Sequence, residues 1–368
     1  MHLPFCAERC GYCSFNTAPY TPAGLDRFLA AVTHECDLLA ASSWAPGVAL
    51  DTLFLGGGTP SLVDAPQMAE LLGHLGRRLA LEATAEVTVE CNPDDVTVER
   101  LTGYHRAGVT RISLGVQSLD DTVLSRLDRR HSAAEAARAF RAAREAGFDN
   151  VSVDLIYGLP GLDLPTWTAT VRDILAWGPA HLSAYALGLD EGSLWHAAGV
   201  AGLPTEETVT EQYWTLARLA SEAGFEHYEI SNYARPGFRS GHNQRYWRWE
   251  EYLALGPGAC GFLGRVRYSN VRPVERYCTL VEADGLPLQT HEVLTDRQAL
   301  AERLILGLRT SDGIPAAWLS ERCALERGRL PELLDTWHER GLLAERDGRV
   351  RLTEAGFLLS DALFTELL

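Results

Sequence analysis

The feature that most constrains this fold is an alternation of short β-type runs and longer amphipathic helical patterns over about 230 residues. The runs predict strands over 51–55, 86–91, 111–116, 151–157, 181–187 and 226–233, and helices over 24–41, 65–80, 97–107, 133–146, 165–176 and 206–223. Ser132 and Glu135 predict a capping box at the start of the helix over 133–146. The alternation indicates an α/β protein with a parallel sheet and helical crossovers, either a barrel or a doubly wound layer.

Glycine and polar residues follow the predicted strands. These segments are Gly56-Gly57-Gly58-Thr59-Pro60, Cys91-Asn92-Pro93, Gln117-Ser118, Gly158-Leu159-Pro160 and Ser231-Asn232-Tyr233. Ligands collect at the carboxyl ends of parallel strands in barrels and in doubly wound sheets alike. The ligand site is therefore expected at this edge of the sheet.

Charge composition excludes several function classes. The chain of 368 residues carries 33 basic residues, all of them Arg, against 49 acidic ones, which gives a net charge of −16. The absence of lysine excludes a Walker-type phosphate loop, a Schiff-base enzyme and a lysine general base. The acidic balance argues against nucleic-acid binding. No apolar run approaches the roughly 20 residues that span a bilayer, so a cytoplasmic protein is expected, with peripheral membrane contact left open.

Three cysteines near the N-terminus have the spacing of a metal site. Cys6, Cys10 and Cys13 form a C-x3-C-x2-C pattern. Three thiolates can hold three irons of a 4Fe-4S cluster and leave the fourth iron open for another ligand. Zinc is the alternative, with His2 as a fourth ligand, and unligated cysteines are a third reading. The spacing favours the cluster.

Candidate ligand-binding side chains lie at or just after successive strands. Glu90, Gln117, Arg129 and Asp154 could bind ammonium, hydroxyl and carboxylate groups, and the turn over 56–59 offers backbone groups at close range. The glycine run could equally be only a tight turn, and Asp154 could be a solvated carboxylate. A carboxylate within the apolar run over 153–157 is costly unless it is paired, which favours a functional role for Asp154.

A series of ordered motifs carries a family resemblance. They are HLPFC at 2–6, GGGTPS at 56–61, ECNP at 90–93, SLGVQS at 113–118, DLIYGLP at 154–160, YEISNYA at 228–234, HNxxYW at 242–247, LTxxG at 352–356 and SD at 360–361. Together they resemble the radical S-adenosylmethionine (SAM) family of oxygen-independent coproporphyrinogen oxidases and the related heme chaperones. The resemblance covers essentially the whole chain.

The resemblance implies three regions. Residues 1–235 would form a partial (β/α)6 radical SAM barrel with an N-terminal cluster loop. Residues 236–295 would be an aromatic and arginine-rich connecting segment, and residues 296–368 a small α+β, winged-helix-like domain of the coproporphyrinogen oxidase type. The family has a β-strand immediately before the HLPFC motif, whereas this sequence starts at Met1, which predicts an unpaired edge beside the cluster unless the start is misassigned.

The resemblance also implies cofactor contacts. Cys6, Cys10 and Cys13 would hold a 4Fe-4S cluster, and the amino and carboxylate groups of SAM would chelate its open iron. Gly57, Gly58 and Thr59 would lie beside the methionyl group. Glu90, Gln117, Arg129 and Asp154 would contact the methionyl and ribose groups. Tyr12 would lie over the adenine, unless it only packs the loop. An electron donor would reduce the cluster, and in the family's mechanism electron transfer from the reduced cluster cleaves the sulfonium bond of SAM and gives a 5′-deoxyadenosyl radical.

One position separates the two branches of the family. The oxidases carry a further cysteine two places after the third, where this chain has Phe15, and they carry an N-terminal extension that this sequence lacks. The resemblance therefore implies a chaperone that binds heme and passes it to an acceptor protein. The alternatives are the oxidase itself, which decarboxylates propionate side chains, and a zinc-stabilised binding module.

The stretch over 242–262 is the candidate heme region. His242 opens the HNxxYW motif, and Cys260 stands where related chaperones commonly carry histidine, so both are candidate axial ligands. Tyr246, Trp247, Trp249, Arg245 and Arg248 offer the aromatic faces and cations that a porphyrin with two propionates requires. Ordinary aromatic packing over the open barrel is the other explanation.

Overall fold

The computed structural model describes residues 1–45, 47–325 and 329–367. Within them, the main sheet has eight strands in the order β1-β4-β5-β6-β7-β8-β10-β9, and all neighbours from β1 to β8 are parallel. The parallel strands are β1 (His2–Leu3), β4 (Leu50–Gly57), β5 (Leu81–Cys91), β6 (Arg111–Gln117), β7 (Asn150–Tyr157) and β8 (His181–Ala186). The predicted partial barrel of six parallel strands is confirmed.

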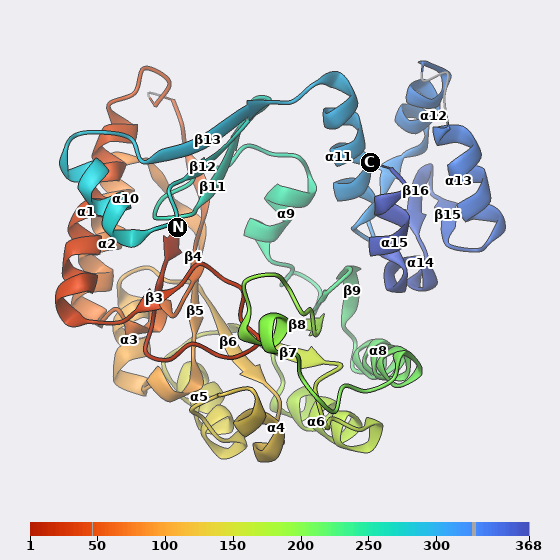
Figure 1. Ribbon diagram of the computed structural model, residues 1–368, viewed down its shortest axis with the longest axis horizontal. Helices are drawn as coiled ribbons and strands as arrows, with labels where there is room; N and C mark the ends of the chain where they lie inside the picture. The colour runs from red at the N-terminus through yellow and green to blue at the C-terminus, as the bar shows by residue number, and fades with distance from the viewer. Residues whose placement is uncertain (46, 326–328, 368) are drawn as a thin grey trace.

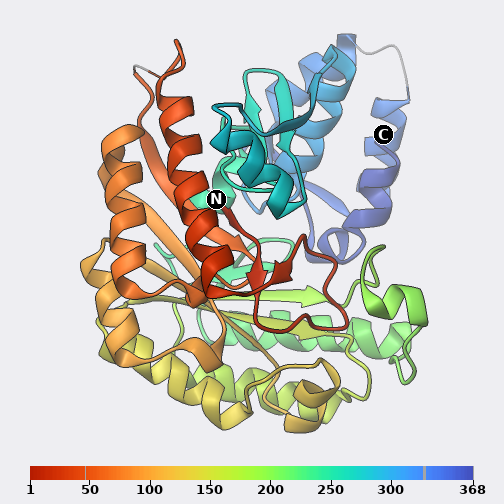
Figure 2. The same ribbon diagram turned by 60° about the vertical axis from the view of Figure 1, so that its left-hand side comes forward.

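Helices cover the outer face of this sheet (Figures 1 and 2). They are α1 (Pro22–Ala40), α2 (Ala65–Arg78), α3 (Val98–Arg106), α4 (Asp121–Arg126), α5 (Ala133–Glu145), α6 (Leu164–Trp177) and α8 (Glu206–Glu222). The short helix α7 (Leu194–Ala198) instead lies beside the N-terminal cysteine loop, where the Trp195 amide donates to the Gly11 carbonyl oxygen. The capping box of Ser132 and Glu135 is present at the start of α5. None of the helices in the described part of the chain is long and apolar enough to cross a membrane.

The two faces of the strands differ in polarity. On β6, Ile112 and Leu114 are fully buried in the apolar core, whereas Arg111 and Ser113, which alternate with them, line a cavity inside the barrel. Successive residues of a strand point to opposite faces, so this alternation gives one face to the helices and the other to the barrel interior. The interior of the barrel is therefore polar and partly open.

The predicted strand over 226–233 is corrected by the structure. It consists of two strands, β9 (Glu226–Glu229) and β10 (Asn232–Ala234), joined as an antiparallel hairpin, and β10 is antiparallel to β8. A two-residue connection is too short for the crossover that parallel strands need. The sixth parallel strand is instead β1, at the other end of the sheet.

The expected unpaired edge beside the first strand is also corrected. Leu3 of β1 pairs with Gly57 of β4, and the amide of His2 donates to the carbonyl oxygen of Leu255 at 2.8 Å. The connecting segment thus covers the outer side of this short strand.

The connecting segment packs against α1. It contains α9 (Gly241–Trp247), β11 (Cys260–Leu263), β12 (Val266–Asn270), α10 (Val274–Glu282) and β13 (Leu288–Val293). The buried Glu35 carboxylate of α1 accepts hydrogen bonds from the Tyr277 hydroxyl at 2.6 Å, the Asn270 amide at 2.7 Å and the Gly256 backbone amide at 2.8 Å. A buried carboxylate with three donors fixes the segment to the barrel.

The C-terminal elements surround a core of their own. They are α11 (Asp296–Leu308), β14 (Ile314–Pro315), α12 (Ala316–Leu325), α13 (Leu330–Glu339), β15 (Leu343–Arg346), β16 (Arg349–Leu352), α14 (Glu354–Leu358) and α15 (Ser360–Thr365). Trp337 is fully buried in this core. Three helices followed by the β15–β16 hairpin form the winged-helix-like arrangement predicted from the sequence. An ion pair of 3.1 Å between Arg309 and the fully buried Glu229 joins these elements to the barrel.

A three-cysteine cavity at the mouth of the barrel

The cysteine loop is attached to the end of β4. Cys6 ends β2 (Phe5–Cys6), which pairs with β3 (Ala18–Pro19) and so closes the loop on itself. The amides of Gly58 and Thr59 donate to the carbonyl oxygens of Leu3 and Phe5, each at 2.7 Å. These bonds place the loop over the carboxyl ends of the parallel strands.

Two other strand-end segments hold the loop from outside. The Gly11 amide donates to Asp128 Oδ2 at 3.1 Å, and the Trp195 amide donates to the Gly11 carbonyl oxygen at 3.0 Å. The Arg9 guanidinium donates to the Gly192 carbonyl oxygen at 2.7 Å. A Cβ atom on Gly11 would lie 2.5 Å from Trp195 Nε1, which is closer than side chains tolerate. These contacts hold the loop against the segments that follow α4 and β8.

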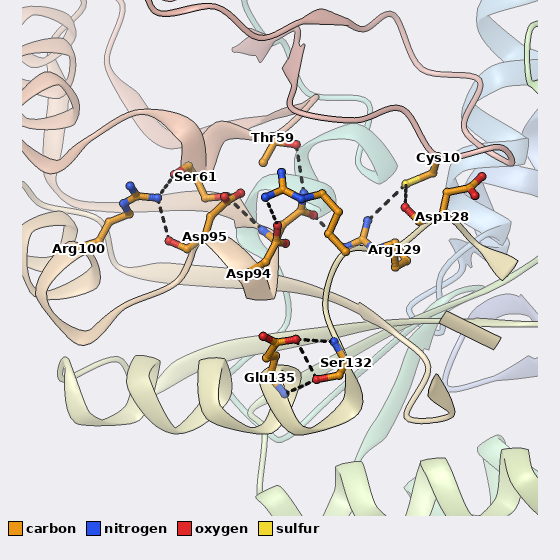
Figure 3. A network of polar contacts seen from close by, with 12 residues as sticks. Cys10, Thr59, Ser61, Asp94, Asp95, Arg100, Asp128, Arg129, Ser132 and Glu135 are labelled. Carbon is orange, nitrogen blue, oxygen red and sulfur yellow. Dashed lines mark hydrogen bonds and ion pairs between the residues drawn. The ribbon is translucent and has the colours of Figure 1, made fainter. Parts of the chain in front are cut away.

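A polar network links Arg129 to Cys10 and, through Asn92 and Thr59, to Cys6. Figure 3 shows the part of this network around Cys10, Arg129 and Thr59. Arg129 Nη2 donates to the Gly115 carbonyl oxygen at 2.7 Å and to Asn92 Oδ1 at 2.9 Å, while its Nη1 lies 3.9 Å from Cys10 Sγ. The Asn92 amide donates to the Thr59 hydroxyl at 3.2 Å, and that hydroxyl lies 3.5 Å from Cys6 Sγ. The guanidinium is therefore held in one orientation beside the cysteine loop.

Two carboxylates line the wall of the cavity. Glu90 Oε2 accepts a hydrogen bond from the Gly57 amide at 3.0 Å, and Asp154 accepts from the Ser113 hydroxyl at 2.9 and 3.0 Å. Burial raises the pKa of Glu90 to about 7, an effect that the Gly57 amide opposes. Burial also raises the pKa of Asp154, and the Ser113 hydroxyl opposes this shift. A cationic ligand would lower the pKa of both carboxyl groups, because a nearby positive charge favours the ionised form.

The backbone at two strand ends has a conformation that few side chains allow. Gly57 has a φ of 113°, and a Cβ atom there would lie 1.8 Å from the His2 ring. Gln117 has a φ of 65°, which is uncommon for a residue other than glycine. Such positions cluster at binding sites, where the surrounding structure maintains them.

One cavity of about 440 Å³ is lined by all the residues predicted to contact the cluster or SAM. These are Cys6, Cys10, Cys13, Tyr12, Gly57, Gly58, Thr59, Glu90, Gln117, Arg129 and Asp154. The Tyr12 ring lies 6.1 Å from the Trp195 ring, at an angle of 59°. The structure thus brings together residues that are up to 148 positions apart in the sequence (Cys6 to Asp154).

The donor set suits a polynuclear cluster better than a single ion. Within residues 1–45, 47–325 and 329–367, no three His, Cys, Asp or Glu side chains are placed to hold one metal ion. His2, the fourth zinc ligand considered from the sequence, contacts the Pro257 carbonyl oxygen through Nδ1 and does not line the cavity. Three thiols spread around one cavity match a cluster in which each thiolate binds its own iron. Burial raises the pKa values of Cys6 and Cys13, so metal binding would release protons.

Sequence reasoning missed several residues that line the same cavity, among them Arg111, Tyr185 and Asn243. Arg111 is only 2 % exposed, and its Nε has no hydrogen-bond partner in the described part of the chain. Its position could have been found from the period of two, because Arg111 lies on the same strand face as Ser113. Asn243 comes from α9 and could not have been placed from strand periodicity.

The structure does not place His242 and Cys260 in this cavity. His242 Nδ1 lies 2.8 Å from the Thr52 hydroxyl, and Nε2 lies 2.7 Å from the Tyr246 hydroxyl. Both ring nitrogens therefore have partners, and burial lowers the pKa of His242 to about 3. Cys260 is exposed at the start of β11. Iron ligation by His242 would require the loss of one of these hydrogen bonds.

A parallel partial barrel with three cysteines over its carboxyl edge defines a radical SAM protein. The model of the radical SAM superfamily matches residues 1–174, and the model of the HemN C-terminal domain matches residues 294–359. The chain belongs to the radical SAM superfamily and, within it, to the family of proteins named heme chaperone HemW.

Individual relatives match over nearly their full length. The heme chaperone HemW of Bacillus subtilis is 35 % identical over 99 % of this chain and 97 % of the relative. The HemW of Mycobacterium tuberculosis strain H37Rv is 38 % identical over 100 % of this chain and 94 % of the relative. The solved structure of coproporphyrinogen III oxidase (HemN) from Escherichia coli is 22 % identical, with a TM-score of 0.86 over 100 % of this chain and 88 % of that one. This last likeness supports the fold.

Proposed function

We propose that this protein binds heme and transfers it to an acceptor protein, and that it carries a 4Fe-4S cluster and SAM. The observation that carries the proposal is the similarity to proteins named heme chaperones at 35 and 38 % identity, which extends over almost the whole chain. The proposed partners are a heme-accepting protein and an electron donor for the cluster.

In this proposal Cys6, Cys10 and Cys13 hold the cluster. When bound, the cluster supplies one-electron reduction and an open iron for the amino and carboxylate groups of SAM. Arg129, held by the Gly115 carbonyl oxygen and Asn92, places a positive charge beside Cys10, where it stabilises the negative charge of a thiolate. It also offers a partner to a carboxylate in the cavity.

The remaining contacts to SAM are assigned from the charge and polarity of its chemical groups. Glu90 and Asp154 provide acceptors for its ammonium and ribose hydroxyl groups, and Gln117 provides an amide at the strand end. Gly57, Gly58 and Thr59 border the methionyl chain, since glycine leaves the backbone accessible. Tyr12, between the cysteines and Trp195, provides an aromatic face for the adenine.

The oxidase remains the second candidate, because its solved structure has the same fold. Phe15 argues against it. This residue is 64 % exposed and lines the cavity at the position where the sequence resemblance places the additional cysteine of the oxidases.

Heme ligation by His242 or Cys260 is a finer part of the proposal. The Cys260 thiol is exposed, whereas the ring nitrogens of His242 are hydrogen-bonded, so Cys260 is the more available ligand. Ligation by Cys260 predicts that Cys260→Ala shifts the Soret band of bound heme. Ligation by His242 predicts the same shift for His242→Gln instead.

Anaerobic reconstitution followed by two assays tests the main proposal. The expected result is uptake of iron, sulfide and heme, with no conversion of coproporphyrinogen III in the presence of SAM and a reductant. Accumulation of protoporphyrinogen IX would establish the oxidase. A colourless protein that takes up no sulfide would instead support the zinc-stabilised module.

A further inference from the structure

A second cleft, of about 300 Å³, lies between the connecting segment and the C-terminal domain. One wall comes from α9 and the residues after it, and the other from residues of α11, α12 and β16. In Figure 1, α11 is the C-terminal helix drawn next to α9. The residues that give the cleft its character are Trp247, Trp249, Trp318, Arg248, Arg303 and Arg349. Its volume is within the range of small-molecule sites in proteins.

Three tryptophans line the cleft, and the Arg309 guanidinium lies over the ring of one of them, Trp247, at 4.4 Å. Trp249 has a φ of 59°, rare for a bulky residue, and its ring packs edge-on against Phe262 at 4.8 Å. The indole Nε1 of Trp247 is buried and has no hydrogen-bond partner among the described residues. Trp318 belongs to the C-terminal domain and lines the same cleft as Trp247 and Trp249. Indole rings at a cleft provide flat apolar surfaces for a planar ligand.

The charge of the cleft is opposite to that of the protein. Four arginines, Arg239, Arg248, Arg303 and Arg349, line it together with a single acidic residue, Asp312, in a chain of net charge −16. Arg239 pairs with Asp312 at 2.9 Å. Arg248 and Arg303 form no ion pair within the described residues, and Arg303 lies over the Trp318 ring at 5.1 Å. Two uncompensated cations beside indole rings favour an anionic aromatic ligand.

We infer that this cleft binds the macrocycle and the carboxylates of a porphyrin, with Trp318 against the ring and Arg303 and Arg248 on the propionates. The inference rests on the proposed heme function and gives it a location outside the cysteine cavity. No His, Cys or Met is among the residues that line the described cleft. The Tyr228 hydroxyl, which does line it, already contacts His181 Nε2 at 2.8 Å and accepts from the Ser240 amide at 3.2 Å. The cleft therefore recognises the ring and its carboxylates, and the iron is not required.

Absorbance titrations of the full chain with haemin, with metal-free protoporphyrin IX and with its dimethyl ester test the inference. We expect the first two to bind the wild type with similar affinity and the ester to bind at least about tenfold more weakly, because it cannot pair with arginine. Arg303→Gln and Trp318→Ala should each weaken protoporphyrin binding roughly five- to twentyfold. Arg303→Lys should restore part of the lost affinity.

Matched control variants separate local binding from general charge. Arg322 also lies near the Trp318 ring, at 5.8 Å, but does not line the cleft, so Arg322→Gln should bind as the wild type does. Arg303 is exposed, so its substitution leaves the C-terminal core intact and keeps the test valid if Trp318→Ala does not fold.

The outcomes distinguish the inference from the function on which it rests. Haemin binding that is unchanged in Arg303→Gln and in folded Trp318→Ala would overturn the cleft and leave heme binding in place. Binding of haemin without binding of metal-free protoporphyrin would do the same, since iron ligation would then dominate. A wild-type protein that binds neither compound would overturn both proposals.

Discussion

The Arg129 guanidinium lies 3.9 Å from the sulfur of Cys10, while its other nitrogen is held by the Gly115 carbonyl oxygen at 2.7 Å. A fixed positive charge beside a cysteine and within a ligand cavity serves both the thiolate and any bound carboxylate. We expect Arg129→Gln to weaken SAM binding by about ten- to a hundredfold, the usual effect of losing a charge-assisted hydrogen bond. Calorimetry on anaerobically reconstituted protein measures this.

Arg130, the residue after Arg129, provides the control for this prediction. Arg130 pairs with Asp94 at 3.3 Å, and its side chain is about half exposed, outside the cavity. Arg130→Gln should bind SAM as the wild type does. An equal loss of affinity in both variants would mean that the effect is one of net charge and not of the Arg129 position.

Cys10→Ala should abolish the broad absorption near about 400 nm that thiolate-ligated iron produces. Far-ultraviolet circular dichroism should be retained, because Gly11 and Arg9 hold the loop independently of metal. Cys260→Ala, which removes an exposed thiol outside the cavity, should keep its cluster. Iron retained by Cys10→Ala at the wild-type level would contradict the ligand assignment.

Glu90 makes the stability of the cofactor-free protein depend on pH. Burial raises the pKa of this carboxyl from 4.5 to about 7. The folded state therefore holds a proton that the unfolded state releases, so the group's contribution is fully present below about pH 4.5 and is lost as the pH rises to about 7. Glu90→Gln should exceed the wild type in unfolding free energy at pH 8, by on the order of 2 kcal/mol, and the difference should shrink at pH 5. Urea unfolding at the two pH values measures it. A difference independent of pH would assign the effect to packing.

Gly57→Ala should be strongly destabilising for two reasons. The new Cβ atom would collide with the His2 ring, and the backbone φ of 113° is strained for alanine. Gly108 has a similar φ of 101° but open space around it, so Gly108→Ala isolates the backbone strain of about 1 kcal/mol. Thermal unfolding should show the larger loss for Gly57→Ala. Equal losses would mean that β1 moves away from β4 at little cost.

Local patterns predicted the helices and the barrel strands well, because each has a clear period and a definite end, such as the Ser132 capping box of α5. Local patterns gave the wrong prediction where the pairing between strands decides the structure. The run over 226–233 reads as one strand, but the hairpin of β9 and β10 depends on contacts with β8 that no local period encodes.

The same distinction holds for the site. Glu90, Gln117 and Asp154 were found because parallel strand ends converge at one edge. Arg111 was overlooked because it begins its strand, below that edge, and Asn243 because it reaches the cavity from α9. One partner of His242, Thr52, lies 190 positions before it, so only the folded chain reveals that both ring nitrogens are engaged.

The ion pair between Arg309 and Glu229 limits how the winged-helix-like domain can move relative to the barrel. Separating the winged-helix-like domain from the barrel would break this ion pair and expose the Glu229 carboxylate, which is fully buried in the closed arrangement and also accepts hydrogen bonds from Ser231 and Asn232. A hinged swing of that domain is thus disfavoured at rest. In the resting protein the two parts are therefore expected to move as one body, with rearrangements confined to side chains along the seam.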